Sequence, residues 1–134
     1  MDEVIDYLTN IPAWFFATCE GDQPRVRPFS FAAKDGGKLW FCTATNKDVY
    51  VQLEANPKFE ASGWHPGQPW IVVTGEADLE DTVSEPTRVA GYEHMTGLGE
   101  TYEGPNDPRL TFFSVKNGIA KIADIDGSER IIEL

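Results

Sequence analysis

The chain has 134 residues, the length of a single domain, and its 11 basic and 22 acidic residues give a formal net charge of −11. Nucleic acids and anionic membranes are bound by broad basic surfaces, so this composition argues against both as partners. The acidic start at Asp2 and Glu3 is unlike a signal peptide, and no apolar run approaches the roughly 20 residues of a membrane span. Cys19 and Cys42 show neither metal-site nor disulfide spacing, so we expect one cytoplasmic domain, residues 1–134, with reduced thiols.

The first half of the chain predicts a short helix, three strands and a second helix. An apolar stripe indicates a helix from Asp2 to about Asn10. The segments WFFATCE, RVRPFSFAAK and KLWFCT are rich in aromatic and β-branched residues and are separated by GDQP and DGG turns. We therefore expect an antiparallel meander of three strands. A two-turn helix follows from Lys47 to Ala55, because Asn56-Pro57 ends the pattern.

The second half predicts more strands and one further helix. A strand over 58–64 precedes the loop HPGQP, and WIVVTGEADL reads as a long strand in which Gly75 marks a bulge or bend. Ser84-Glu85-Pro86 is a helix start, with the helix reaching about Met95 and a loop over 97–108. The remaining segments read as LTFFSVK, a hairpin at Asn117-Gly118, GIAKIADI and RIIEL.

These elements define the expected fold class. Six or more strands with two or three short helices, and no regular βαβ alternation, indicate a mainly β protein. We expect an antiparallel barrel or strongly coiled sheet, whose closure would remove exposed strand edges.

Positive charge is concentrated in residues 24–53 of this acidic chain. That segment contains five basic and two acidic residues, a balance of +3, whereas the remainder carries −14. Strand alternation places Arg25, Arg27 and Phe29 on one face, with the two arginines about 7 Å apart. They could hold a small anion, or they could form a solvated face paired with carboxylates. Pro28 leaves a ladder position open where a ligand could meet the backbone.

A second cationic feature lies where the third strand ends and a helix begins. Thr43-Ala44-Thr45-Asn46-Lys47 brings hydroxyls, an amide, an ammonium and free backbone N–H groups to a helix N-terminus, which suits a phosphate. Simple helix capping by Thr45 or Asn46 explains the same residues. The segment lacks the glycines of a P-loop.

Other residues give weaker signals. His65 and His94 have no obvious partner, so we expect no metal site, and no arrangement of residues identifies a catalytic side chain. Trp64 and Trp70 flank the proline-rich loop and could border a planar ligand.

Taken with their order and spacing, FATCEGDQPRVRPFSF, KLWFCTATNKDVYVQLEANPKFE and WIVVTGEA resemble the small bacterial proteins of the pyridoxamine 5'-phosphate oxidase-like group. The resemblance covers nearly the whole chain. It implies the FMN-binding split β-barrel fold and a homodimer with two FMN sites at the subunit interface.

Carried over position by position, the resemblance also implies the cofactor-binding residues. Arg25 and Arg27 would lie near the phosphate and the isoalloxazine edge, and the backbone of residues 27–29 along the ring. Cys42 and Thr43 match the strand end that meets the ribityl-phosphate, and residues 45–47 match the phosphate-binding turn. The full expected set is Arg25, Val26, Arg27, Pro28, Phe29, Cys42, Thr43, Thr45, Asn46, Lys47 and Trp70.

The resemblance has two departures. Many relatives have a basic residue where this chain has Val72, and residues 82–107 match no pattern of the group. The long substrate-binding extension of true pyridoxamine phosphate oxidases is absent, so we do not expect vitamin B6 oxidation.

Our leading hypothesis is an FMN-dependent oxidoreductase that transfers a hydride through flavin N5 to or from a small substrate. A non-catalytic flavin- or haem-binding carrier or sensor, and an acidic interaction module without a small ligand, remain alternatives. The sequence names neither the substrate nor the electron donor, and it does not separate FMN from a deazaflavin.

Overall fold

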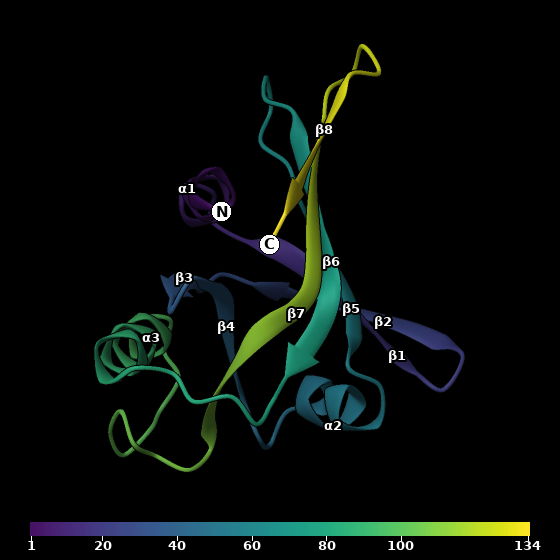
Figure 1. The fold of residues 1–134 in the computed structure, drawn as a ribbon. Helices are drawn as coiled ribbons and strands as arrows, with labels where there is room; N and C mark the ends of the chain where they lie inside the picture. Colours follow the sequence, from purple (N-terminus) through teal and green to yellow (C-terminus); the bar gives the residue numbers. More distant parts are fainter.

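The computed structural model describes residues 1–134 and contains one antiparallel sheet of eight strands with three helices (Figure 1). The expectation of a mainly β fold is confirmed. The helices are α1 (Asp2–Thr9), α2 (Asp48–Ala55) and α3 (Glu85–Gly97). The strands are β1 (Trp14–Glu20), β2 (Gln23–Phe29), β3 (Ala32–Asp35), β4 (Lys38–Ala44), β5 (Lys58–Gly63), β6 (Trp70–Asp78), β7 (Leu110–Ala123) and β8 (Glu129–Glu133). No helix combines the length and apolar character needed to cross a membrane.

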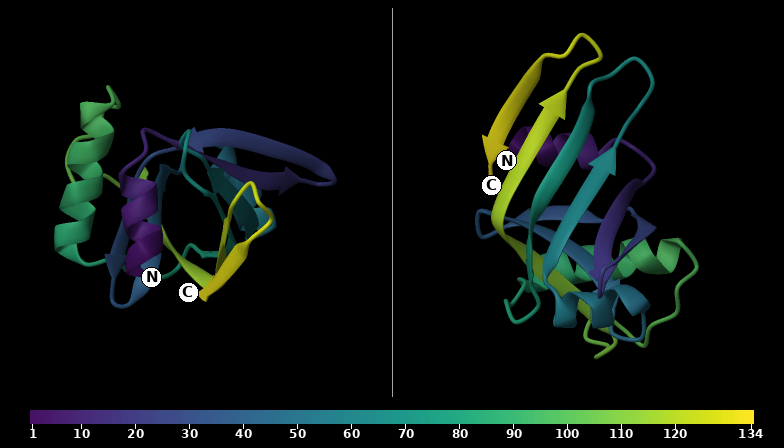
Figure 2. Two further views of the ribbon diagram at one scale, coloured as in Figure 1. Left: turned by 90° about the horizontal axis from the view of Figure 1, so that it is seen from above. Right: turned by 90° about the vertical axis from the view of Figure 1, so that its right-hand side faces the viewer.

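The sheet coils without closing. Its order is β2-β1-β5-β6-β7-β4-β3, and the long β7 pairs with β6 along one side, with β4 and then β8 along the other. Of the two expected forms, the structure has the strongly coiled sheet, in which β2 and β3 remain edges. This open sheet is consistent with the split barrel. Figure 2 shows the strands curving around a common interior, with α3 outermost on one side.

The predicted three-stranded meander is wrong. The segment RVRPFSFAAK is not one strand, because it breaks after Phe29 into β2, which pairs with β1, and β3, which pairs with β4. These two pairs lie at opposite ends of the strand order. At the break, the Ser30 Oγ lies 2.8 Å from Nε2 of His94, and Phe31 is buried beneath α3. Burial of Phe31 under a helix thus takes the chain out of the first ladder.

The predicted hairpin at Asn117-Gly118 is also wrong. Strand β7 continues through this dipeptide, with Asn117 in the left-handed region at φ 53°. On the neighbouring β6 the register shifts between Thr74 and Glu76, which confirms the predicted bulge at Gly75. A Cβ on Gly75 would lie 2.7 Å from Val115 Cγ1, so only glycine permits the close approach. Asn117-Gly118 therefore lies at a bend in β7 that accompanies the bulge in the neighbouring β6, and not at a hairpin turn.

Two apolar cores lie on opposite faces of β4. The larger core fills the coiled sheet around Phe16, Phe41 and Phe113, with α1 and α2 packed on it. The smaller core lies under α3 and contains these residues: Phe31, Trp40, Cys42, Val83, Met95, Leu110 and Phe112. Because successive residues of β4 enter different cores, this strand is buried on both faces.

The contact between α3 and the sheet depends on Gly91. A Cβ added there would lie 2.4 Å from the Phe112 ring, so Gly91→Ala is expected to destabilise the protein by about 1–3 kcal/mol through overpacking. Gly97→Ala is the matched control, because a Cβ at that position meets nothing within 4 Å. Urea unfolding of both variants measures the difference. Equal midpoints would show that α3 moves away at little cost.

Candidate anion-binding cleft

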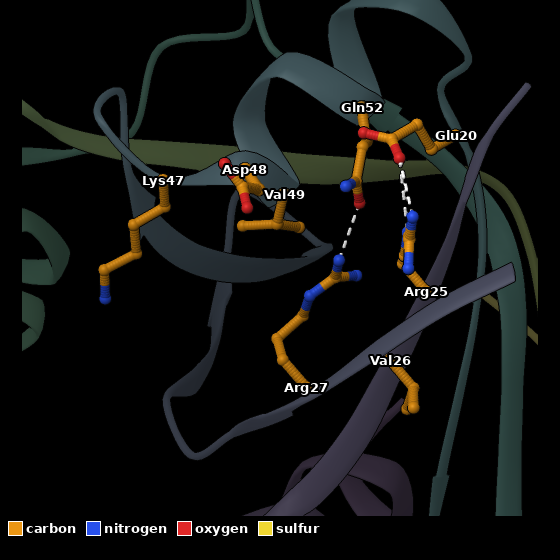
Figure 3. Close-up of a pocket in the computed structure, with 8 residues that line it drawn as sticks. All are labelled: Glu20, Arg25, Val26, Arg27, Lys47, Asp48, Val49 and Gln52. Carbon is orange, nitrogen blue, oxygen red and sulfur yellow. Dashed lines mark hydrogen bonds and ion pairs between the residues drawn. The ribbon is translucent and has the colours of Figure 1, made fainter. Parts of the chain in front are cut away.

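A cleft of about 580 Å³ opens between the β1–β2 hairpin and the N-terminus of α2 (Figure 3). It brings together two parts of the chain that the sequence marked as cationic. Its lining residues are Glu20, Arg25, Val26, Arg27, Lys47, Asp48, Val49 and Gln52. The volume lies within the range of about 300–1,000 Å³ typical of small-molecule sites.

The two arginines share one face of β2, as the alternation predicts. Arg25 pairs across the ladder with Thr18, and Arg27 with Phe16, both of which are buried. The side chains of β2 that face the core therefore include both guanidinium groups. Phe29 continues this face and stacks on Phe16 with ring centroids 4.4 Å apart. Val26 and Pro28 point to the opposite, exposed face.

Arg27 is held in a fixed position. Its NH1 donates to the Phe16 carbonyl oxygen at 3.2 Å and to Thr18 Oγ1 at 2.7 Å, and its NH2 donates to Gln52 Oε1 at 2.6 Å. A guanidinium has five N–H donors, so two are free of these contacts. Burial lowers the pKa of Arg27, and the nearby Asp48 carboxylate opposes that shift. The group stays charged, because arginine ordinarily titrates far above neutrality.

Arg25 and Lys47 are arranged differently from Arg27. Arg25 is half-exposed and forms an ion pair with Glu20 at 2.9 Å. Lys47 extends away from both arginines (Figure 3), and its ammonium lies 2.8 Å from the Glu100 carboxylate. All three cations therefore border one cleft, but their charged ends do not meet at one point.

The start of α2 offers polar groups without partners. Lys47 is the N-cap residue in an extended conformation, and no side chain caps the helix. The first-turn N–H groups of a helix have no partner within it, so those of Asp48 and Val49 are available. The Asp48 carboxylate follows in the first turn, where the helix dipole favours negative charge.

Thr43 supplies a further polar group near this helix. Its hydroxyl is buried without a hydrogen-bond partner, an arrangement that costs about 1–3 kcal/mol. Thr43 is two residues after Phe41 on β4, and side chains two apart on a strand share a face. The Thr43 side chain therefore lies on the same face as Phe41, the face of the larger core. Cys42 points the other way, toward α3, and burial raises the pKa of its thiol to about 12. The thiol is therefore protonated at neutral pH.

The remaining expected residues divide between two places. Thr45 and Asn46 lie in the turn between β4 and α2, where the Thr45 N–H donates to the Arg109 carbonyl oxygen at 2.8 Å. Trp70 begins β6 at the far end of the sheet from α2 (Figure 1). It borders a separate cleft of about 520 Å³ with Ser62, Trp64, Gly67, Gln68, Asp124 and Ile125. Within one chain, Trp70 is not part of the first cleft.

Sequence reasoning missed the polar partners of the cations. Gln52, Thr18, Glu20 and Glu100 each contact a predicted residue. Only Gln52 carried a signal, because a polar side chain between Val49 and Leu53 interrupts the apolar stripe of α2. Glu100 lies 53 positions from Lys47 in the chain, and no local pattern joins them.

Comparison with solved structures identifies several relatives. A NimC/NimA family protein from Clostridium acetobutylicum is 29% identical with a TM-score of 0.85, and the match covers all of this chain and 92% of that one. An F420 reductase is 26% identical with a TM-score of 0.59, covering 83% and 90%. A pyridoxamine 5'-phosphate oxidase-related, FMN binding protein from Nostoc punctiforme shares the fold at 13% identity, with a TM-score of 0.61 and coverage of 99% and 90%.

No curated protein matches the chain in sequence. The family model described as Pyridoxamine 5'-phosphate oxidase matches residues 1–118, which include every strand of the cleft and most of the sheet. This match agrees with the fold of the structural relatives and with the resemblance seen in the sequence. The chain belongs to the pyridoxamine 5'-phosphate oxidase family.

Proposed function

We propose that the protein binds FMN and acts as an oxidoreductase on a small substrate. The observation that carries the proposal is the pair of arginines on one face of β2, opposite the uncapped N-terminus of α2, in a chain of this family. The names of two relatives, an FMN binding protein and an F420 reductase, support a flavin-type cofactor. F420 is a different cofactor, so the choice of FMN is part of the proposal.

The residues of the cleft fit a phosphate monoester. Arg25, Arg27 and the free N–H groups of α2 would hold its oxygens, and Thr43 has an unpartnered hydroxyl near the same helix. Glu20 and Asp48 oppose this attraction, so the ligand must draw Arg25 away from Glu20. The backbone of residues 27–29 would lie along the ring system. When bound, FMN supplies hydride transfer at its N5 atom.

We further propose that a second copy of the chain covers the outer face of the sheet. Phe15, Val26 and Ile131 are each more than half exposed there. The ladder partners place Phe15 beside Ser62, Ser62 beside Val72, and Val72 beside Lys121, which in turn lies beside Ile131. This row crosses five strands, and a chain carrying −11 needs such apolar surface to associate with itself. Trp70 lies outside the first cleft of its own chain, and we propose that it completes the cleft of the second copy, as the resemblance implies for a site at the subunit interface.

The test separates binding from turnover. The protein is titrated with FMN, and binding is measured by the quenching of flavin fluorescence and by native mass spectrometry. We expect two FMN molecules bound per two chains. Anaerobic addition of NADH or NADPH is then expected to bleach the flavin absorbance. A protein that leaves FMN fluorescence unchanged contradicts the proposal. If the protein binds FMN but neither nucleotide bleaches it, with any of a panel of electron acceptors, the result would favour the alternative function of a carrier or sensor.

A further inference from the structure

The ammonium of Lys47 already has an anionic partner inside the protein. It lies 2.8 Å from Glu100 Oε1, and the Tyr102 hydroxyl donates to the same oxygen at 2.8 Å. The Glu100 side chain is only 27% exposed, less than the 44% of Lys47. Lys47 is the lysine that borders the cleft. Its ion pair with Glu100 therefore connects the cleft to a segment that is distant in the sequence.

That segment, residues 98–109 between α3 and β7, is here called the strap, and its own contacts hold Glu100 in place. At one end the Glu100 N–H donates to the Met95 carbonyl oxygen at 3.1 Å, continuing from α3. At the other end Arg109 forms an ion pair with the buried Asp107 at 2.8 Å, and its guanidinium lies 5.5 Å from the Tyr102 ring centroid. The strap therefore holds the Glu100 carboxylate in place through contacts at both of its ends.

The charge state of Glu100 suits this role. Burial alone would raise the pKa of its carboxyl group, but hydrogen bonds from Lys47 and Tyr102 outweigh burial and leave the pKa below its usual value. Glu100 is thus an anion at neutral pH, and its carboxylate already holds the ammonium of Lys47.

We propose that Glu100 is an internal competitor for Lys47, so that a phosphate monoester gains this ammonium only by displacing the strap carboxylate. The inference rests on the proposed binding of FMN and identifies a residue that sets its affinity. A phosphate monoester carries about −1.5 to −2 charges at neutral pH, so it can exceed a single carboxylate in attraction for Lys47. A flavin without phosphate has no such charge and leaves the pair intact. Glu100 therefore weakens the binding of phosphorylated flavins and leaves the binding of unphosphorylated flavins unchanged.

A double-mutant cycle tests the competition, with FMN affinity as the readout. Glu100→Gln is expected to bind FMN about two- to fivefold more tightly than the wild type, because the partly exposed ion pair no longer has to be broken. In a Lys47→Ala background the same substitution is expected to have no effect, since nothing remains to compete for. Glu103→Gln removes an exposed carboxylate of the strap that does not contact Lys47 and controls for general charge. Riboflavin affinity should be equal in all variants.

Hydrogen exchange gives a second readout that needs no turnover. Adding FMN to the wild type is expected to increase amide exchange in residues 98–103 as Glu100 is released, with no increase in the Lys47→Ala variant. The inference is wrong, and the proposed function stands, if the wild type binds FMN and Glu100→Gln binds it no more tightly. The same holds if Glu100→Gln increases FMN affinity by the same factor in the Lys47→Ala background as in the wild type. If neither the wild type nor Glu100→Gln binds FMN, the proposed function fails and the competition fails with it.

Discussion

Replacing Arg27 with alanine is expected to weaken FMN binding by about ten- to hundredfold. Hydrogen bonds to charged groups contribute about 1.5–3 kcal/mol each, and Arg27 presents its free donors from a position fixed by three protein contacts. Fluorescence titration of the variant with FMN measures the loss. The fold should persist, because Thr18 donates to Gln52 at 2.5 Å and both keep a partner without Arg27.

Lys38→Ala is the matched control for Arg27→Ala. It also removes one positive charge from the sheet, but Lys38 pairs with Asp81 outside the cleft. Both variants should unfold cooperatively on heating, and only Arg27→Ala should lose affinity. Equal affinity in the two variants would contradict a role for Arg27 in the site.

Replacing Phe15 with aspartate is expected to convert the proposed homodimer into monomers at micromolar concentration. Phe15 is 55% exposed in the single chain and lies between Pro28 and Ser62 on the outer face, so a carboxylate there costs little in the monomer. In a covered interface the same carboxylate would be buried without a partner, which costs several kcal/mol. Sedimentation velocity measures the change in mass.

Leu98→Asp makes the same change of charge on a residue that is 61% exposed after α3, away from the outer face. It should leave the mass unaltered. A wild type that sediments as a monomer, or a Phe15→Asp protein that still sediments as a dimer, would exclude this face as the interface.

Local patterns predicted the elements of this fold better than their pairing. The helix over residues 48–55, the strand before the HPGQP loop and the bulge at Gly75 follow from apolar spacing and backbone chemistry close in the chain. The break after Phe29 does not, because it depends on Phe31 packing against Phe112 and α3, far along the chain. At Asn117-Gly118 the turn chemistry is real, but pairing with two neighbouring strands keeps β7 continuous.

The site shows the same division. Alternation correctly placed Arg25 and Arg27 on one face, and the helix start brought Lys47 to the border of the same cleft. What the sequence could not show is how each cation is already engaged, since Glu20 is near in the chain but Glu100 approaches through the tertiary fold. Whether the expected residues hold FMN stays a prediction for the titrations above.

The separation of β2 from β3 has a consequence for how the chain folds. Strand β4 finds its second partner in β7, with Trp40 opposite Ser114, so the chain must close a loop of more than seventy residues to complete that ladder. Such distant pairing gives a high contact order, and proteins of this kind fold in milliseconds to seconds rather than microseconds. Until β7 arrives, the β3–β4 hairpin is an unprotected edge rich in aromatic residues. Strand β4, which leads into α2 at the cleft, therefore gains its second neighbour only when β7 has paired.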